Sequence, residues 1–137
     1  MSDAIYQQAL KDLAQAAHGT APLARHDGEA KRDTPLCGDR VKIQVALSAG
    51  RIEALAHETR GCLLCRASAS TLGLRAPGRT ADEIAIAARA LRAMLATGDA
   101  PPADWPELAL FLPVRGHSSR HGCVLLPFDT LLEALSP

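Results

Sequence analysis

The sequence predicts an α+β fold in which helices pack on one face of a small antiparallel sheet of about three strands. Apolar and polar residues alternate over residues 41–47, which is the period of a strand with one buried face. A turn and a second strand-like segment follow, so this part of the chain is expected to form a hairpin. Before and after the hairpin, apolar residues recur with helical spacing.

Length and composition favour one compact domain over residues 1–137, with 47% hydrophobic but only 3% aromatic residues. The 15 Lys and Arg residues balance the 15 Asp and Glu residues, so we exclude nucleic acid and membrane surfaces as partners. No apolar run reaches the roughly 20 residues of a membrane helix, and the N-terminus shows no export signal. We therefore expect a cytoplasmic protein, where four cysteines favour metal binding or thiol chemistry over disulfides.

The first part of the chain is expected to be a helix followed by a loop. Apolar spacing predicts an amphipathic helix over about residues 3–18, ended by Gly19. Residues 20–33 contain a proline, a glycine and scattered charges, and we interpret them as a loop. His18 and His26 are interpreted as solvated surface residues, since nothing near them in sequence offers a second metal ligand.

The hairpin predicts which functional residues meet. Its strands are expected at residues 41–47 and 52–59. Cys37 and Asp39 precede the first strand, and Cys62 follows the second. In an antiparallel hairpin those two ends lie side by side, so we expect these three residues at one edge of the sheet.

Helices are expected to follow the hairpin. Leucines and small residues predict a helix over about residues 63–74, with Cys62 at its N-terminus, where the helix dipole favours a thiolate. Thr80 and Glu83 fit a capping box that begins a second helix, which ends near Ala96.

The last third of the chain has weaker patterns. Residues 98–106 are interpreted as a proline-rich connection and residues 113–122 as an irregular loop, with one short helical turn at 107–111. Apolar residues from Cys123 onward predict a C-terminal helix, with Pro127 in or near its first turn.

Three cysteines and one aspartate form a candidate metal site. Cys37, Cys62 and Cys123 each lie at a segment boundary beside glycine or charge rather than within an apolar stripe. Asp39 follows Cys37 by two residues, so both side chains can face one cleft. Three thiolates and a carboxylate suit a tetrahedral zinc ion or an iron–sulfur cluster.

Cys62 and Cys65 also form a C-x-x-C motif, which is typical of redox pairs and of zinc knuckles. The chain has no second C-x-x-C, so a four-cysteine zinc ribbon is not favoured. The preceding hairpin argues against a thioredoxin-like fold. Cys65 lies on the apolar side of the predicted helix, and two interpretations stay open for it, a functional thiol and a small buried hydrophobic residue.

Several motifs, spread over nearly the whole chain, together resemble the IscU/NifU N-terminal iron–sulfur scaffold family. The chain is most similar to its SufU-like branch, which has a longer stretch between the second and third cysteines and lacks the histidine that IscU places before the third. The motifs are Thr34-Pro35-Leu36-Cys37-Gly38-Asp39, Gly61-Cys62 with Ala67-Ser68-Ala69-Ser70, Gly78-Arg79-Thr80 with Glu83, and Pro113-Val114-Arg115 with Arg120-His121-Gly122-Cys123 and Leu126.

The resemblance implies a SufE/NifU-like fold and one zinc ion bound by Cys37, Asp39, Cys62 and Cys123. It also implies sulfur transfer, in which a cysteine desulfurase passes persulfide sulfur to this chain for delivery to downstream iron–sulfur assembly proteins. The acceptor is then Cys37, with Cys123 as second choice. The chain is expected to act as a sulfurtransferase-like partner of the desulfurase rather than as a stand-alone enzyme. Two alternatives stay open, a scaffold for a transient [2Fe–2S] cluster and a structural zinc domain.

The chain departs from the family pattern at a few positions. Thr34 stands where the family often has asparagine. The loop before Cys123 carries two additional histidines. His121, two residues before Cys123, is interpreted as a residue that supports a ligand or faces a partner, with replacement of a ligand as the alternative. His117 is interpreted as a solvated loop residue. Arg115 and Arg120 are interpreted either as cations that balance the charge of the site or dock a desulfurase, or as ordinary surface residues.

Overall fold

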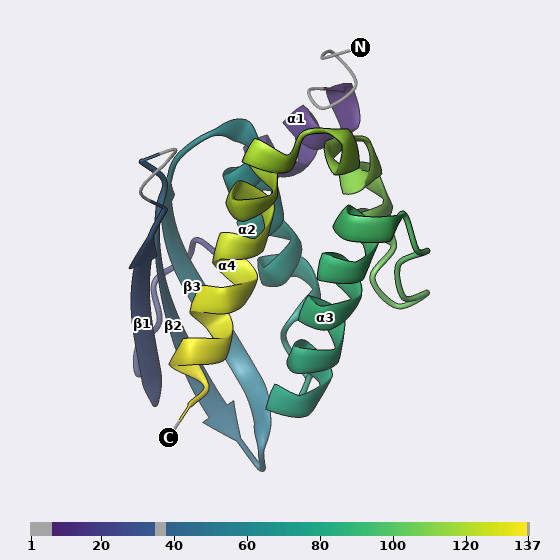
Figure 1. Cartoon of the computed structure of the whole chain (residues 1–137). Coiled ribbons are helices and arrows are strands. Elements are labelled where there is room, and N and C mark those ends of the chain that lie inside the picture. Colours follow the sequence, from purple (N-terminus) through teal and green to yellow (C-terminus); the bar gives the residue numbers. More distant parts are fainter. Residues whose placement is uncertain (1–6, 35–37, 137) are drawn as a thin grey trace.

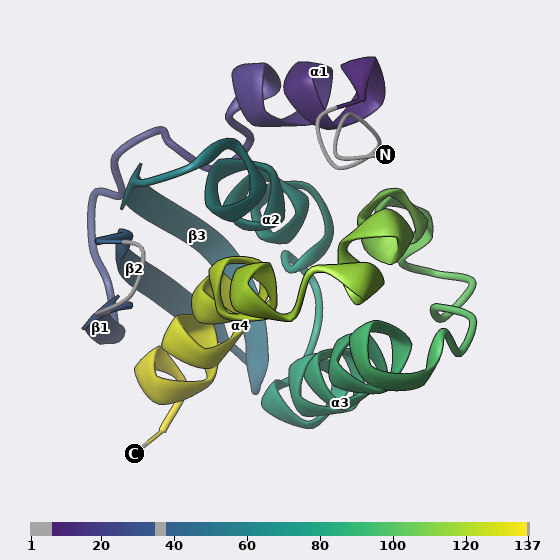
Figure 2. The same cartoon turned by 45° about the horizontal axis from the view of Figure 1, so that its top comes forward.

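The computed structural model describes residues 7–34 and 38–136 and confirms the predicted α+β architecture. Figure 1 shows the helices gathered on one side of a twisted sheet, and Figure 2 shows the same layers from above. The elements in chain order are α1 (Gln8–Ala16), β1 (Gly28–Asp33), β2 (Arg40–Ser48), β3 (Arg51–Arg60), α2 (Leu63–Arg75), α3 (Ala81–Thr97), the 3₁₀ segments η2 (Pro106–Gly116) and η3 (Ser118–Arg120), and α4 (His121–Ala134).

The sheet is antiparallel, with the strand order β1-β2-β3. The predicted hairpin is confirmed as β2 and β3, and Val41, Ile43 and Val45 of β2 are fully buried under the helices. The prediction of a loop over residues 20–33 is wrong for its last part, because residues 28–33 form β1. This edge strand buries only Ala30, so it has no apolar alternation, and it is held by pairing with β2.

Two helices cover the sheet and others pack on them. α4 packs against β1 and β2, and α2 packs against β3, whereas α1 lies on α2 and α3 lies on α4. α2 is central and buries residues on all sides, including Ala67 and Ser68. The Ser68 hydroxyl donates a 2.6 Å hydrogen bond to the carbonyl of Val124. This bond ties the N-terminal half of α2 to the start of α4.

The helix predictions need two corrections. α1 ends at Ala16, with Ala17 and not Gly19 as its left-handed cap, and residues 3–6 of the predicted helix lie outside the described residues. The capping box of α3 is confirmed, because the Glu83 N–H donates to Thr80 Oγ1 (3.2 Å) and the Thr80 N–H donates to Glu83 Oε1 (2.9 Å). Pro127, however, lies in the middle of α4 and not in its first turn. Its ring is buried, so the packing of α4 outweighs the hydrogen bond that a proline cannot donate.

The segment predicted to be an irregular loop, residues 113–122, is also partly regular. It contains the end of η2, all of η3 and the first residues of α4. Its few apolar residues explain why no period is visible in the sequence. Within the described residues, no helix is long and apolar enough to cross a membrane.

Candidate metal centre

Asp39 is placed by the connection between β1 and β2. The Thr34 N–H donates to the Asp39 carbonyl (2.9 Å), and the Asp39 N–H donates to Thr34 Oγ1 (3.3 Å). Gly38 has a φ of +69°, a conformation that favours glycine. The side chain of Thr34 therefore helps to position Asp39. The sequence analysis noted only that the family often has asparagine at this position. Asp39 itself is only 1% exposed.

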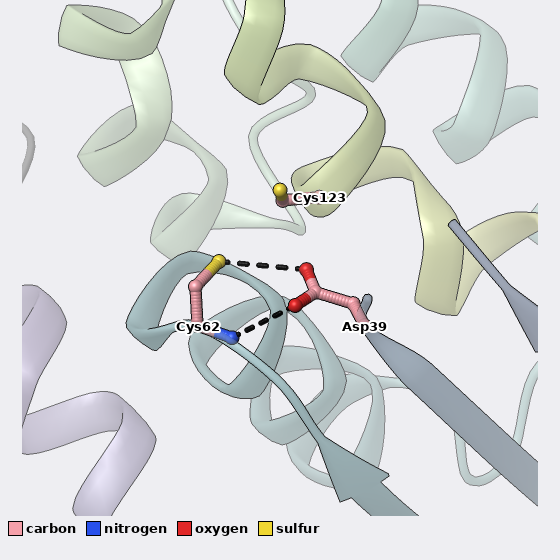
Figure 3. Close-up of side chains that lie close together, drawn as sticks. All are labelled: Asp39, Cys62 and Cys123. Atoms are coloured by element: carbon pink, nitrogen blue, oxygen red, sulfur yellow. Dashed lines mark hydrogen bonds between the residues drawn. The ribbon is translucent and has the colours of Figure 1, made fainter. Parts of the chain in front are cut away.

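The carboxylate of Asp39 meets Cys62 at the end of the hairpin (Figure 3). Its Oδ1 accepts a 3.0 Å hydrogen bond from the Cys62 N–H, and the Cys62 Sγ donates to Oδ2 across 3.5 Å. The strand register explains why Asp39 and Cys62 lie close together. Arg40 of β2 pairs with Arg60 of β3, so Asp39, which precedes Arg40, lies beside Gly61, which follows Arg60. The predicted contact between Asp39 and Cys62 is therefore confirmed.

Gly61 makes room for this carboxylate. A Cβ at Gly61 would lie 2.5 Å from Asp39 Oδ1 and 2.6 Å from its Cγ. Such contacts are far inside the ordinary van der Waals range, so any other residue at this position must displace Asp39.

Asp39 also caps α2. Cys62 is the N-cap residue, with φ −69° and ψ 169°, close to the −88° and 165° of Thr80 at the N-cap of α3. In α3 the N-cap N–H is bound by the carboxylate of Glu83, one turn away. In α2 the same N–H is bound by Asp39, which comes from a different part of the chain. The Asp39 carboxylate therefore binds the N-cap N–H of α2 and also faces the Cys62 thiol.

Cys123 completes the group. It is the third residue of α4 and is fully buried. The ligand atoms of Asp39, Cys62 and Cys123 all lie within 4.8 Å of one another (Figure 3). The N-termini of α2 and α4 both reach this point, and neither helix has an acidic residue in its first turn. Their dipoles therefore favour negative charge on the group.

The three side chains fit a zinc or iron ion. With Zn–S near 2.3 Å and Zn–O near 2.0 Å, a tetrahedral ion separates sulfur and oxygen ligands by about 3.5 Å. The Cys62 Sγ and Asp39 Oδ2 are 3.5 Å apart, which matches this expected separation. Soft thiolates beside one carboxylate are the donors that zinc and iron–sulfur clusters use. Cys37, the predicted fourth ligand, lies outside the described residues.

The ring of His121 binds backbone carbonyls and does not belong to the group of Asp39, Cys62 and Cys123. The Nε2 of His121 lies 3.0 Å from the carbonyl oxygens of both Val114 and Arg115, so the ring N–H ties the first residue of α4 to the end of η2. This contact fits the predicted supporting role. His117 is half-buried at the junction of η2 and η3, and not fully solvated as predicted.

The arginines and Cys65 have different surroundings. The guanidinium of Arg115 lies near Gly98 at the C-terminal end of α3, where the helix dipole favours a cation, and this supports the surface interpretation. Cys65 is fully buried among core residues, which fits the interpretation as a small buried hydrophobic residue and leaves a functional thiol open. Its thiol is not part of the Asp39–Cys62–Cys123 group.

His57 is a buried polar residue that the sequence reasoning missed. Its Nε2 lies 2.8 Å from the His18 carbonyl, which can only accept, so Nε2 carries the proton and Nδ1 accepts from the Thr59 hydroxyl at 2.9 Å. Burial lowers the pKa of His57 from 6.5, partly opposed by the hydrogen bond to His18. The strand period was a usable signal, because His57 pairs with buried Ile43.

Comparison with known proteins identifies the family. The sequence model for the NifU-like N-terminal domain matches residues 5–109. The chain belongs to this family. This is the NifU N-terminal scaffold family that the motifs predicted. No curated protein matches the chain at a significant level.

Solved structures of the same fold extend the match to the end of the chain. The N-terminal part of a nitrogen-fixing NifU-like protein from Brucella abortus is 31% identical, with a TM-score of 0.92 over 98% of this chain and 94% of that one. A putative iron–sulfur cluster assembly scaffold protein for the SUF system, from Fervidobacterium islandicum AW-1, is 22% identical, with a TM-score of 0.87 over 99% of this chain and 100% of that one. Asp39 and Cys62 lie within the family match, whereas Cys123 lies only within the structural matches.

Proposed function

We propose that this chain is a zinc-dependent sulfur-transfer protein, which accepts persulfide sulfur from a cysteine desulfurase for iron–sulfur cluster assembly. The observation that carries the proposal is the group of Asp39, Cys62 and Cys123, whose ligand atoms lie within 4.8 Å of one another. Membership of the NifU-like N-terminal domain family supports the same process.

The residues of the group have distinct roles in this proposal. Asp39, Cys62 and Cys123 hold the zinc, and Cys37 is the fourth ligand and the sulfur acceptor. Bound zinc keeps the thiols deprotonated at neutral pH. Asp39 would be the hardest donor among soft ones, and so the ligand that a partner group would replace most easily. The N-termini of α2 and α4 balance the negative charge of the thiolates.

The transfer step is an exchange between sulfurs. The Cys37 thiolate attacks the outer sulfur of the desulfurase persulfide, and a new sulfur–sulfur bond forms on Cys37. The bond within the persulfide breaks, and the desulfurase cysteine leaves as a thiolate. Cys123 is the second choice for acceptor, but it is fully buried, which disfavours direct attack on a partner.

One experiment tests the proposal. The purified chain is assayed for metal content and then mixed with a cysteine desulfurase and L-cysteine, with alanine formation as the readout. We expect a colourless protein with one zinc per chain that raises desulfurase turnover, and a Cys37→Ser variant that does not. Absence of zinc, or unchanged stimulation by Cys37→Ser, contradicts the proposal.

Two alternatives give different results in the same preparation. A scaffold for a transient [2Fe–2S] cluster, which family membership also supports, predicts a brown, iron-containing protein when it is purified without oxygen. A structural zinc domain predicts that chelation unfolds the chain and that no desulfurase responds. The continuous apolar core makes this last alternative the weakest, because burial on this scale stabilises the fold without metal.

A further inference from the structure

Among the described residues, the metal group contains Cys62 of the C-x-x-C motif but not Cys65. The group therefore gives no role to the two cysteines as a pair. We propose that Cys62 and Cys65 form a dithiol pair that reduces sulfane sulfur to sulfide and closes to a disulfide as it does so. The proposal rests on the proposed function, in which a desulfurase supplies persulfide, and it applies to the metal-free chain, in which zinc does not hold Cys62. It adds a reductive step, which iron–sulfur clusters require because they contain sulfide.

The positions of the two residues in α2 bring them together. Cys62 is the N-cap residue and Cys65 is the third residue of the helix. In α3 the residues at these positions, Thr80 and Glu83, each reach the backbone of the other. The backbone angles of the two N-cap residues agree within 20°. Helical residues three apart have Cβ atoms about 5–6 Å apart, so a small tightening of the first turn allows a disulfide.

The thiols of Cys62 and Cys65 differ in burial, and this suggests a different role for each. Cys62 is half-buried and is accessible to a donor, whereas Cys65 is fully buried behind it. The Asp39 carboxylate accepts the hydrogen bond of the Cys62 thiol at 3.5 Å and comes from outside the helix. A half-buried thiol that accepts sulfur and a buried thiol that then attacks it are the two groups that this sulfur–sulfur exchange needs.

The proposed reaction has two balanced steps. First, the Cys62 thiolate attacks the outer sulfur of a persulfide R–S–SH, so that R–S⁻ leaves and a persulfide forms on Cys62. Second, the Cys65 thiolate attacks the Cys62 Sγ. The bond between the two cysteine sulfurs forms, the bond to the sulfane sulfur breaks, and that sulfur leaves with the electron pair as hydrosulfide. Overall, one persulfide and two cysteine thiols give one thiol, one disulfide and one hydrogen sulfide.

The pair and the metal group exclude each other, because both use Cys62. A chain whose Cys62 is bound to zinc cannot close the disulfide, and a closed disulfide removes one thiolate from the Asp39–Cys62–Cys123 group. Zinc is therefore expected to protect the pair from persulfide.

A single tryptic peptide contains both cysteines of the proposed pair, so its mass reports whether they form a disulfide. Trypsin cleaves after Arg60 and Arg66, and the peptide between them contains Cys62 and Cys65 but no other cysteine. The reduced, metal-free full chain is mixed without oxygen with a low-molecular-weight persulfide such as cysteine persulfide. Released sulfide is then measured, together with the mass of this peptide after remaining thiols are blocked.

We expect one sulfide released for each disulfide formed, with the peptide lighter by two hydrogens and unblocked. The Cys65→Ala variant should keep the added sulfur on Cys62 and lose sulfide release. Zinc added first should suppress both signals in the wild type. A disulfide from Cys62 to Cys37 or Cys123, or undiminished sulfide release by a folded Cys65→Ala chain, overturns the proposal.

The peptide mass of the wild type decides the question even if Cys65→Ala does not fold. Failure here is also distinguishable from failure of the proposed function. Cys65→Ala should still bind one zinc and stimulate a desulfurase, whereas Cys37→Ser should not stimulate it. Disulfide closure without any desulfurase response would remove the proposed function and leave the dithiol pair in place.

Discussion

Gly61→Ala tests the metal centre without changing any proposed ligand. The added Cβ would lie 2.5 Å from Asp39 Oδ1, and ordinary contact begins near 3.4 Å. The carboxylate must therefore retreat by roughly 1 Å, which is enough to break its 3.0 Å hydrogen bond to the Cys62 N–H. No positive φ is recorded at Gly61, so the contact with Asp39, and not backbone strain, causes the effect.

The expected magnitude follows from these contacts. Overpacking of this kind typically costs about 1–3 kcal/mol of the free energy of unfolding, and a lost hydrogen bond to a charged group costs about as much. We expect a loss of about 2 kcal/mol in the metal-free chain, measured by urea denaturation with a chelator present. Displacing a residue that positions metal ligands costs about 10–100-fold in affinity, which competition with a zinc-binding dye will detect.

Gly122→Ala is the matched control, because Gly122 precedes Cys123 as Gly61 precedes Cys62. A Cβ at Gly122 meets no atom within 4 Å. Gly122 lies in the first turn of α4, so alanine should leave zinc affinity unchanged and raise stability by up to about 1 kcal/mol. Two results would refute the reasoning. One is equal zinc affinity in Gly61→Ala and the wild type, and the other is an equal loss of zinc affinity in Gly61→Ala and Gly122→Ala.

Three further predictions follow from single sites. Cys62→Ser and Cys123→Ser should each reduce the zinc content below one per chain by metal analysis, and a full complement in either variant would exclude that residue as a ligand. Burial lowers the pKa of His57, so the unfolded chain binds the extra proton first. Stability is therefore complete above about pH 6.5 and falls as the pH drops below it, by at most about 1.4 kcal/mol per pH unit. His57→Gln should remove this dependence from urea midpoints measured between pH 7.5 and 5.5, and an unchanged slope would contradict the assignment. Thr80→Ala removes one half of the α3 capping box and should lower the free energy of unfolding by about 1 kcal/mol, whereas no loss would show that the cap is redundant.

The meeting of Asp39 and Cys62 was predictable because it is a local consequence of strand pairing. Once the alternation over residues 41–47 and its return strand are recognised, the two ends of the hairpin must be neighbours. Cys123 is different, since 58 residues or more separate it from the other cysteines and no period in the sequence places α4. Its inclusion depended on donor chemistry and on the family resemblance. The structure brings it to the group through the packing of α4 on α2.

The features that were missed are those whose cause is tertiary. β1 buries one residue and depends on β2 for its hydrogen bonds, so its own sequence carries no strand pattern. The helical position of Pro127 reflects the packing of α4, which outweighs a local rule. Thr34 was recognised only as a departure from the family, although its hydroxyl accepts a hydrogen bond from the Asp39 N–H. A hydroxyl that binds one backbone group leaves no signal in a single sequence.

The two oxygens of Asp39 do different things, and this separation is the basis of a last prediction. Oδ1 binds the Cys62 N–H and so caps α2, while Oδ2 faces the Cys62 sulfur. If Asp39 is a metal ligand as proposed, a metal held at Oδ2 could leave while Oδ1 keeps the carboxylate anchored. Asp39→Asn keeps an oxygen for the cap but loses the anionic ligand, whereas Asp39→Ala loses both.

We expect the metal-free Asn variant to unfold within about 1 kcal/mol of the wild type and the Ala variant to lose about 1–3 kcal/mol, because the Cys62 N–H then loses its hydrogen-bond partner. Both variants should bind zinc more weakly than the wild type. Urea denaturation in chelator and zinc competition measure the two effects separately. If Asn and Ala destabilise the metal-free chain equally, Oδ1 is not a helix cap, and the carboxylate is not anchored independently of the metal.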